Sequence, residues 1–190
     1  MKFGIYPNLG KKDLKMALER LTALLRDKNI DYSLPLSMKK GLMDMGFTED
    51  TYETDESMGK RDFILSVGGD GSFLGAARAF RDYPVLMAGL HLGDLGFLNS
   101  MTLRDMEKRV DQILSGDYQE EHRLYLSAAL IHGDGRKEKL PTVLNDVVIG
   151  HASIGQLARI RLFINDSFIQ EYAADGLIIS SPTGSTGMSV

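Results

Sequence analysis

The sequence predicts an α/β protein, in which a parallel α/β domain is followed by a β-rich domain. Through about residue 100, short apolar strands alternate with stretches of helical periodicity, which is typical of a parallel sheet covered by helices. After Gly116 the period changes to two, and strand candidates follow one another without crossover helices. Glycine-rich turns follow two strands of the first half, where ligands bind in such sheets. We therefore predict two domains, 1–100 and 101–190.

The composition is that of an ordinary soluble globular protein, with 43% hydrophobic and 25% charged residues. The net charge of −4, without any basic block, argues against general binding to nucleic acid or to a membrane. The absence of cysteine excludes disulfides, zinc–thiolate sites and thiol catalysis. The N-terminus lacks the apolar core of a signal peptide, and no apolar run approaches membrane-spanning length, so we expect a cytoplasmic protein.

The first domain opens with a predicted strand at 3–6 and a helix whose apolar residues repeat every three or four positions. A weak strand at 32–36 and a methionine-rich helix at 37–45 follow. The acidic segment 48–60 has no apolar period, so we interpret it as a loop. The next strand, 63–67, lacks polar alternation, which is typical of a strand buried on both faces. The apolar residues of the first helix are Leu14, Ala17, Leu18, Leu21, Leu24 and Leu25.

The strand at 63–67 leads into the turn Gly68-Gly69-Asp70-Gly71-Ser72, and a helix-forming run follows it. Strand, glycine turn and helix form a phosphate-binding geometry, because glycine lets the backbone approach a ligand and the helix N-terminus offers free N–H groups. Asp70 is the one side chain in the turn that can accept a proton. Since a carboxylate repels phosphate, we infer that it takes a proton from an attacking hydroxyl. The alternative is that Asp70 only caps the helix.

A second glycine-dense segment, 89–99, follows another apolar strand at 85–89. Both glycine segments leave the carboxyl ends of predicted parallel strands, and this shared position supports a ligand site independently of either motif. Residues 102–105 then form a predicted capping box, which opens a helix to about residue 114.

The second half contains strand candidates and two segments whose polar residues could bind a ligand. Asn145-Asp146 places an amide beside a carboxylate in an apolar strand, and only a strand end or bulge lets both side chains meet one ligand. Asp175 precedes a run of hydroxyls and glycines, 180–188, that suits a phosphate or a ribose. The alternatives are that Asn145-Asp146 is only a turn pair and that 180–188 is only a loop rich in serine, threonine and glycine. The strand candidates are 124–130, 143–149, 157–164, 168–171 and 177–180, with a hairpin turn at 165–166.

These segments, in this order, resemble the NAD kinase family, and the resemblance spans essentially the whole chain. It rests on Gly-Gly-Asp-Gly-Ser at 68–72, Leu-Gly-Phe-Leu at 95–98, the pair at 145–146 and Asp-Gly-Leu-Ile-Ile-Ser-Ser-Pro-Thr-Gly-Ser-Thr at 175–186. The resemblance implies a Rossmann-like parallel α/β domain and a β-rich, β-sandwich-like C-terminal domain, with the dinucleotide between them.

The resemblance also implies a reaction, in which ATP phosphorylates the 2′-hydroxyl of the adenosine ribose of NAD to give NADP. Asp70 would accept the proton of that hydroxyl. Mg²⁺ or another divalent cation would accompany ATP, held mostly by substrate oxygens and water. The implied dinucleotide contacts are Gly68, Gly69 and Gly71 at the diphosphate, Leu74 and Phe97 around adenine, Asn145 and Asp146 at polar groups, Asp175 near the nicotinamide half, and Thr186, Gly187 and Met188 on the adenine side.

The sequence departs from the family pattern at two positions, since Asp146 replaces the usual Glu and Met188 replaces the usual Tyr. Family members also continue beyond Val190, so we expect an incomplete C-terminal domain and a chain that self-associates as a homo-oligomer. We assign no protein ligand to a metal, because the four histidines are scattered without ligand spacing. They are His91, His122, His132 and His151.

Three other interpretations stay open at this point. A phosphofructokinase-like enzyme would use a similar glycine turn, but it also needs a glycine-rich ATP loop near the N-terminus, and residues 7–10 form a poor one. Diacylglycerol and sphingosine kinases carry similar turns. A dinucleotide-binding fragment without turnover is the non-enzymatic alternative. The phosphoryl donor, ATP or polyphosphate, is likewise not fixed by the sequence.

Overall fold

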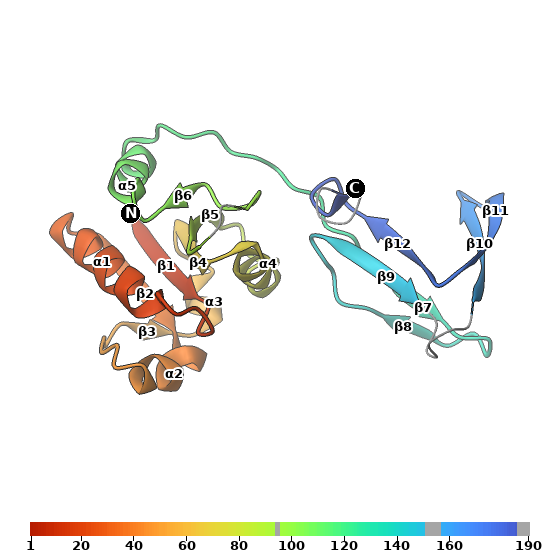
Figure 1. The fold of residues 1–190 in the computed structure, drawn as a ribbon, viewed down its shortest axis with the longest axis horizontal. Helices are drawn as coiled ribbons and strands as arrows, with labels where there is room; N and C mark the ends of the chain where they lie inside the picture. The colour runs from red at the N-terminus through yellow and green to blue at the C-terminus, as the bar shows by residue number, and fades with distance from the viewer. Residues whose placement is uncertain (94–95, 151–156, 186–190) are drawn as a thin grey trace. The chain divides into compact units, whose positions relative to one another are not determined.

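The computed structural model describes residues 1–93, 96–150 and 157–185, and the chain divides into two compact units, Met1–Glu120 and Glu121–Val190. The division falls later than the predicted boundary near residue 100. The reason is that β6 (Met101–Thr102) pairs with the sheet of the first unit, and α5 (Met106–Ser115) packs near β6 (Figure 1). Within the described ranges, no helix is both long and apolar enough to cross a membrane.

The first unit is built on a six-stranded sheet in the order β3-β2-β1-β4-β5-β6, and every neighbouring pair is parallel. The chain moves outward in one direction from β1 and in the other from β4, so the switch point of this doubly wound sheet lies between β1 and β4. The predicted parallel α/β domain is therefore confirmed. The other strands are β1 (Lys2–Pro7), β2 (Asp31–Pro35), β3 (Tyr52–Glu53), β4 (Phe63–Gly68) and β5 (Leu86–His91).

Helices cover both faces of this sheet, and β4 lies buried between them. Leu65 joins the apolar cluster beneath α1 (Leu14–Asp27) and α5, whereas Ile64 joins the cluster beneath α4 (Asp70–Ala79). All six residues of β4 are buried, as its lack of polar alternation predicts. The apolar stripe predicted for α1 points into the core, where Leu14, Ala17, Leu18, Leu21 and Leu25 are fully buried.

The segment 48–60, predicted to be a loop, instead contains β3 and α3 (Asp55–Met58), and it follows α2 (Lys39–Asp44). The prediction was wrong because contacts distant in sequence order the segment. β3 pairs with β2, Met58 is fully buried, and the side chain of Thr54 accepts a hydrogen bond from the N–H of Ser57, which caps α3.

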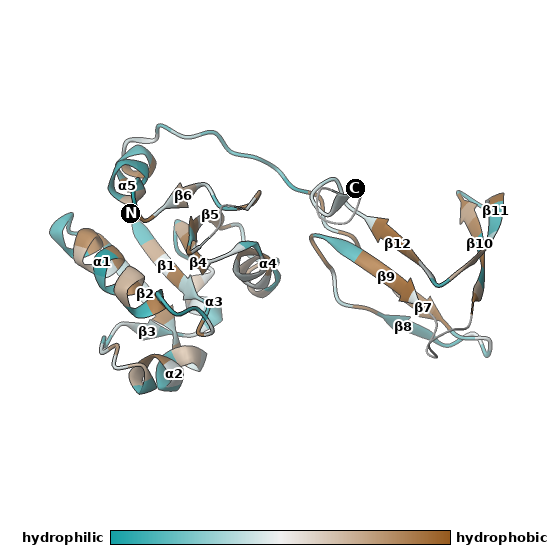
Figure 2. Ribbon diagram, viewed as in Figure 1, coloured by the Kyte–Doolittle hydropathy of each residue, from teal (hydrophilic) through white to brown (hydrophobic). Residues whose placement is uncertain are grey.

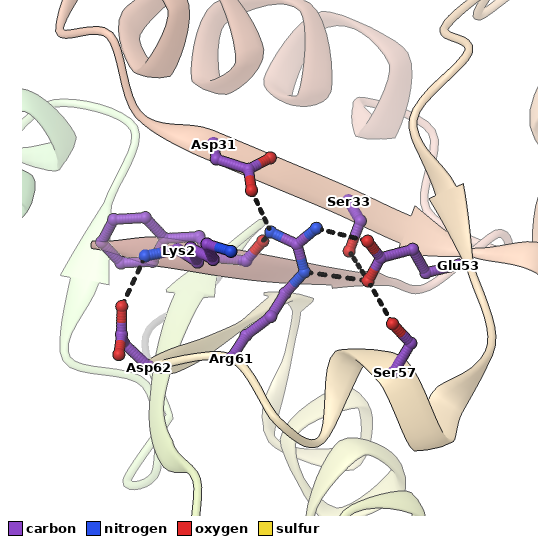
Figure 3. Close-up of polar contacts among 8 residues, drawn as sticks. Lys2, Asp31, Ser33, Glu53, Ser57, Arg61 and Asp62 are labelled. Atoms are coloured by element: carbon purple, nitrogen blue, oxygen red, sulfur yellow. Dashed lines mark hydrogen bonds and ion pairs between the residues drawn. The ribbon is translucent and has the colours of Figure 1, made fainter.

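The same segment is attached to the sheet by Arg61, whose side chain is only 7% exposed (Figure 3). Its guanidinium donates two hydrogen bonds to Glu53, at 2.7 and 3.0 Å, and a third to the backbone carbonyl of Phe3 at 3.2 Å. Asp31 lies 3.5 Å from the same group. The hydrogen bond from Arg61 lowers the pKa of the Glu53 carboxyl. Arg61, Asp31 and Phe3 lie near the amino ends of β4, β2 and β1, whereas the glycine turn follows the carboxyl end of β4, so we interpret this network as structural.

The described part of the second unit consists of three two-stranded antiparallel sheets, which confirms a β-rich region (Figure 1). The predicted hairpin turn is also confirmed, because Asn165 and Asp166 both have positive φ, at 48° and 64°, between β10 and β11. Face-to-face packing of a β-sandwich stays a prediction. The strands are β7 (Ala129–Ile131), β8 (Lys137–Lys139), β9 (Asp146–Gly150), β10 (Ala158–Ile164), β11 (Ser167–Ala174) and β12 (Gly176–Ser180).

Candidate functional site

The first unit contains a pocket of about 530 Å³ at the carboxyl ends of β1, β4 and β5. Three segments line it: Asn8 and Lys11 follow β1, Gly69 and the first turn of α4 follow β4, and His91 at the end of β5 is joined by residues 92–93 and Gly96. Two of these strands, β1 and β4, flank the switch point of the sheet, where ligands bind in open α/β sheets. The position predicted for a ligand site thus coincides with a formed pocket.

The glycine turn is held in shape by Ser72. Its hydroxyl oxygen accepts hydrogen bonds from the Gly69 N–H at 3.1 Å and from the Asn8 side-chain amide at 2.9 Å. Gly68 has a φ of +155°, and a Cβ at this position would collide with the Ser72 hydroxyl. Glycine is therefore required there by space as well as by backbone conformation. Asn8, which sequence reasoning did not identify, fixes the turn against the loop after β1.

Asp70 is the first residue of α4, and its carboxylate bonds to the second glycine segment. Oδ2 accepts a hydrogen bond from the Phe97 N–H at 2.8 Å, and Oδ1 accepts from the Leu98 N–H at 3.2 Å and from the Asn99 side-chain amide at 2.8 Å. The N-cap residue of α4 is Gly69, and the side chain that accepts a hydrogen bond from its N–H is that of Ser72, not that of Asp70. The described contacts therefore do not make Asp70 a helix cap.

These three hydrogen bonds orient the Asp70 carboxylate without saturating it. A carboxylate presents about four lone-pair directions, so one direction stays available for an incoming proton. The approach of the second segment is close: a Cβ on Gly96 would collide with the carboxylate group of Asp70. The two glycine segments predicted separately are thus joined through Asp70, and Asn99 is a further site residue that sequence reasoning missed.

Two more residues of the pocket were missed as site residues. His91, at the end of β5, is 7% exposed, and neither ring nitrogen has a hydrogen-bond partner in the described part of the chain. Leaving a buried polar group unpaired costs about 1–3 kcal/mol, so this ring requires a functional or structural explanation. Lys11 brings positive charge to the same pocket. The sequence does not reveal whether a buried side chain lacks a hydrogen-bond partner. For this reason the sequence analysis treated His91 only as one of four scattered histidines.

The second unit brings Asn145 and Asp146 together with the hydroxyl-rich loop. The Ser181 hydroxyl donates to the Leu144 carbonyl at 2.5 Å and accepts from the Gly184 N–H at 3.1 Å, while the Ser181 N–H donates to the Asn145 carbonyl at 2.9 Å. Asn145 immediately precedes β9, which begins at Asp146. The pair therefore lies at a strand end, the placement that lets adjacent side chains serve one ligand.

Asp175 lies at the other end of the same pair of strands. It precedes Gly176, which pairs with Gly150, whereas Asp146 pairs with Ser180. Gly150 lies four residue steps along β9 from Asp146, which corresponds to about 13 Å at the usual rise per residue. The structure therefore does not bring Asp175 to the Asn145 end of this sheet.

The predicted adenine contacts do not line the pocket at the glycine turn. Leu74 is half-buried on α4, and the Phe97 side chain is 80% exposed. The remaining three predicted residues, Thr186, Gly187 and Met188, lie outside the described residues. Among the described residues, no group of three or more histidine or acidic side chains is arranged to hold a metal ion.

Comparison with known proteins assigns both halves of the chain to one family. Residues 3–118 match the ATP-NAD kinase N-terminal domain, and residues 144–190 match the ATP-NAD kinase C-terminal domain. Among curated relatives, an NAD kinase of Teredinibacter turnerae is 38% identical over 185 residues, covering 96% of this chain and 61% of the relative. An NAD kinase of Thermoanaerobacter sp. is 33% identical over 190 residues, covering 100% and 65%.

Solved structures show the same fold. Yeast NADH kinase complexed with NADH superimposes with a TM-score of 0.85 at 20% identity, covering 100% of this chain and 60% of that one. An NAD kinase from Archaeoglobus fulgidus in complex with ATP gives a TM-score of 0.71 at 18% identity, covering 100% and 64%. The chain spans about three fifths of the length of the curated relatives that it matches. Because the N-terminal family model alone covers more than half of the sequence, this chain belongs to the ATP-NAD kinase family.

Proposed function

We propose that this chain contains the catalytic turn of an NAD kinase, which transfers the γ-phosphate of ATP to the 2′-hydroxyl of the adenosine ribose of NAD and yields NADP. The matches to both family domains support the reaction, and so do relatives that bear the name NAD kinase. The two structural neighbours hold NADH and ATP respectively. A sugar phosphate or a lipid as acceptor is not favoured by any of these matches.

The proposed proton acceptor is Asp70, and the observation that carries the proposal is the placement of its carboxylate. It sits at the N-terminus of α4 in the pocket at the switch point, oriented by three donors and with a lone pair left over. A general base must be held within hydrogen-bond reach of the hydroxyl that it deprotonates, and these bonds fix its position in advance. The glycine turn beside it offers backbone N–H groups to phosphate oxygens.

The second unit is proposed to supply the remaining dinucleotide contacts. Asn145 and Asp146, at the start of β9, would bind polar groups of NAD, and the loop after β12 would contribute hydroxyl and N–H donors. Because Asp175 lies at the far end of β9 and β12, it would contact a different part of the ligand than Asn145 does. A homo-oligomeric state and a cytoplasmic location belong to the same proposal.

Mg²⁺ fits this arrangement as a companion of the triphosphate. Magnesium keeps several waters and is bound largely through substrate phosphates, so the phosphate oxygens and water would hold it here. Among the described lining residues the only carboxylate is that of Asp70, and its remaining lone pair is assigned to the proton. The ion would neutralise negative charge on the phosphate chain. Polyphosphate is the alternative donor, and it would present the same kind of oxygens to the turn.

The experiment is an assay of NADP formation from NAD and ATP, comparing unaltered protein with Asp70→Asn. Turnover should fall by roughly 10²- to 10⁴-fold, the usual loss when a general base is removed. Because Asn also replaces one acceptor with a donor facing the Phe97 N–H, NAD affinity is measured in parallel to show that the turn is intact. Asp82→Asn, at an exposed acid outside the pocket, is the matched control.

Three outcomes decide between the interpretations. Near-normal turnover of Asp70→Asn removes the role of Asp70 as base. NAD binding without any NADP formation by the unaltered chain supports a dinucleotide-binding fragment instead of an enzyme. Phosphorylation of fructose 6-phosphate or of a lipid alcohol in place of NAD would overturn the choice of acceptor.

A further inference from the structure

Two side chains beside the glycine turn have no role in the proposed transfer. His91 ends β5 with 93% of its surface buried, and both of its ring nitrogens lack a partner within the described ranges. Lys11 follows β1, and no ion pair is recorded for its ammonium group among the described residues. Both residues line the pocket that also contains Asp70.

Both side chains converge on Gly69, the residue before α4. A Cβ built on Gly69 would lie 3.8 Å from the Lys11 Nζ and 3.9 Å from the His91 Cε1. The N–H groups of Asp70 and Gly71 occupy the first two positions of α4, where no acceptor exists within the helix. An anion placed over Gly69 would therefore meet an ammonium group, an imidazole edge and the positive end of a ten-residue helix.

The His91 ring can offer this anion a hydrogen bond. Its Cε1 edge faces Gly69, and a half-turn about the Cβ–Cγ bond exchanges Cε1 and Nε2 without changing the outline of the ring. A neutral imidazole protonated at Nε2 then donates toward the turn. Since no described partner holds the ring in either orientation, a ligand can set it.

We propose that Lys11 and His91 together bind one phosphate group of a polyphosphate chain over Gly69, with Lys11 supplying charge and His91 a directed hydrogen bond. This inference rests on the proposed function, because the phosphate would come from the triphosphate of ATP or from the diphosphate of NAD. The negative charge of Asp70 does not forbid it, since three hydrogen-bond donors from residues 97–99 stabilise that carboxylate. Lys11 attracts phosphate as a point charge, and His91 orients it.

The test is calorimetric titration of the full chain with inorganic tripolyphosphate and, separately, with NAD. His91→Leu and Lys11→Met should each weaken binding of one of these ligands by about tenfold or more, the size expected for a lost hydrogen bond or ion contact to a charged group. His91→Gln, which keeps a side-chain donor, should retain most of the affinity. Lys12→Met is the matched control, because Lys12 is exposed and does not line the pocket.

Each result points one way. Weakening confined to tripolyphosphate supports the site with the ATP chain as its ligand, and weakening confined to NAD supports it with the dinucleotide diphosphate. Affinities within twofold of the unaltered chain in both His91→Leu and Lys11→Met overturn the proposal, as does a chain that binds neither ligand. Melting temperatures show whether His91→Leu still folds, and Lys11→Met alone decides if it does not.

The readout also separates this inference from the proposed function. Binding of tripolyphosphate that depends on His91, in a protein that forms no NADP, would keep the phosphate site and remove the activity. Normal NADP formation, with unchanged tripolyphosphate and NAD affinities in both variants, would keep the activity and remove the phosphate site.

Discussion

Two strands with nearly the same apolar sequence, β4 and β12, differ in how far their side chains are buried. In β4 of the first unit, Ile64 and Leu65 are both fully buried, because helices cover each face of the sheet. In β12 of the second unit, Ile178 is 43% and Ile179 44% exposed, although consecutive residues point to opposite faces. Figure 2 shows most of β12 in the brown of hydrophobic residues.

The comparison shows that an apolar sequence allows a strand to be buried, but that neighbouring helices decide whether it is. An unbroken apolar run is typical of a strand that can be covered on both faces, and β4 receives that cover from α1, α5 and α4. The partner of β12 is β9, whose Val148 is 60% exposed, so this pair satisfies backbone hydrogen bonds but buries little apolar surface. The first unit should therefore hold most of the stability.

The largest expected difference comes from the same substitution in both strands. Ile64→Ala should lower the free energy of unfolding by about 2–5 kcal/mol, because it leaves a cavity in a closed core. Ile178→Ala should change it by about 0.5 kcal/mol or less, as is usual for substitutions at the surface. Urea titration followed by hydrogen exchange of peptides from each unit measures both. Equal losses at the two positions would show that β12 is covered in solution.

A second prediction uses the polar network of the first unit. Arg61→Met should cost about 1–3 kcal/mol, because it leaves the Glu53 carboxylate without its main donor. Since Arg61 holds the pKa of Glu53 below its ordinary value of 4.5, the stabilisation is complete above that pH and is lost as the pH falls through the lowered value. The difference between the two proteins in urea titrations should therefore shrink on acidification. A difference that grows below pH 4.5 would contradict this assignment.

The sequence predicted the location of the pocket better than it predicted which residues contact the glycine turn. Alternation of elements predicted the parallel sheet, and the glycine turn predicted where the pocket would form. The partners of that turn were not predictable, because Asn8, Asn99 and Lys11 reach it from loops that are distant in sequence. The interpretation of the acidic segment 48–60 as a loop was wrong for the same reason, since its strand β3 pairs with β2, which lies far away in sequence. Local periodicity reports which face is apolar, but not which distant residue will satisfy a polar group.

The second unit shows the same limit with different residues. Asn145 and the hydroxyl-rich loop were singled out separately, and the bonds of Ser181 join them. Asp175 precedes the hydroxyl-rich loop in sequence, yet the register of β9 and β12 places it at the opposite end of the sheet. Residues that are close in sequence can therefore lie at opposite ends of a strand, because an extended chain advances about 3.4 Å per residue.

The third prediction tests whether the Ser181 hydroxyl holds together the polar contacts of the second unit. Its side chain is 2% exposed and bridges the Leu144 carbonyl to the Gly184 N–H, so Ser181→Ala leaves both groups without this partner. We expect a cost of about 1 kcal/mol, confined to the second unit, together with faster hydrogen exchange at Gly184. Ser185→Ala is the matched control, because its exposed hydroxyl donates only to the Pro182 carbonyl within the described chain. Unchanged exchange at Gly184 in Ser181→Ala would mean that the loop keeps its shape without the hydroxyl, and that the backbone bond from Ser181 to Asn145 is sufficient to hold it.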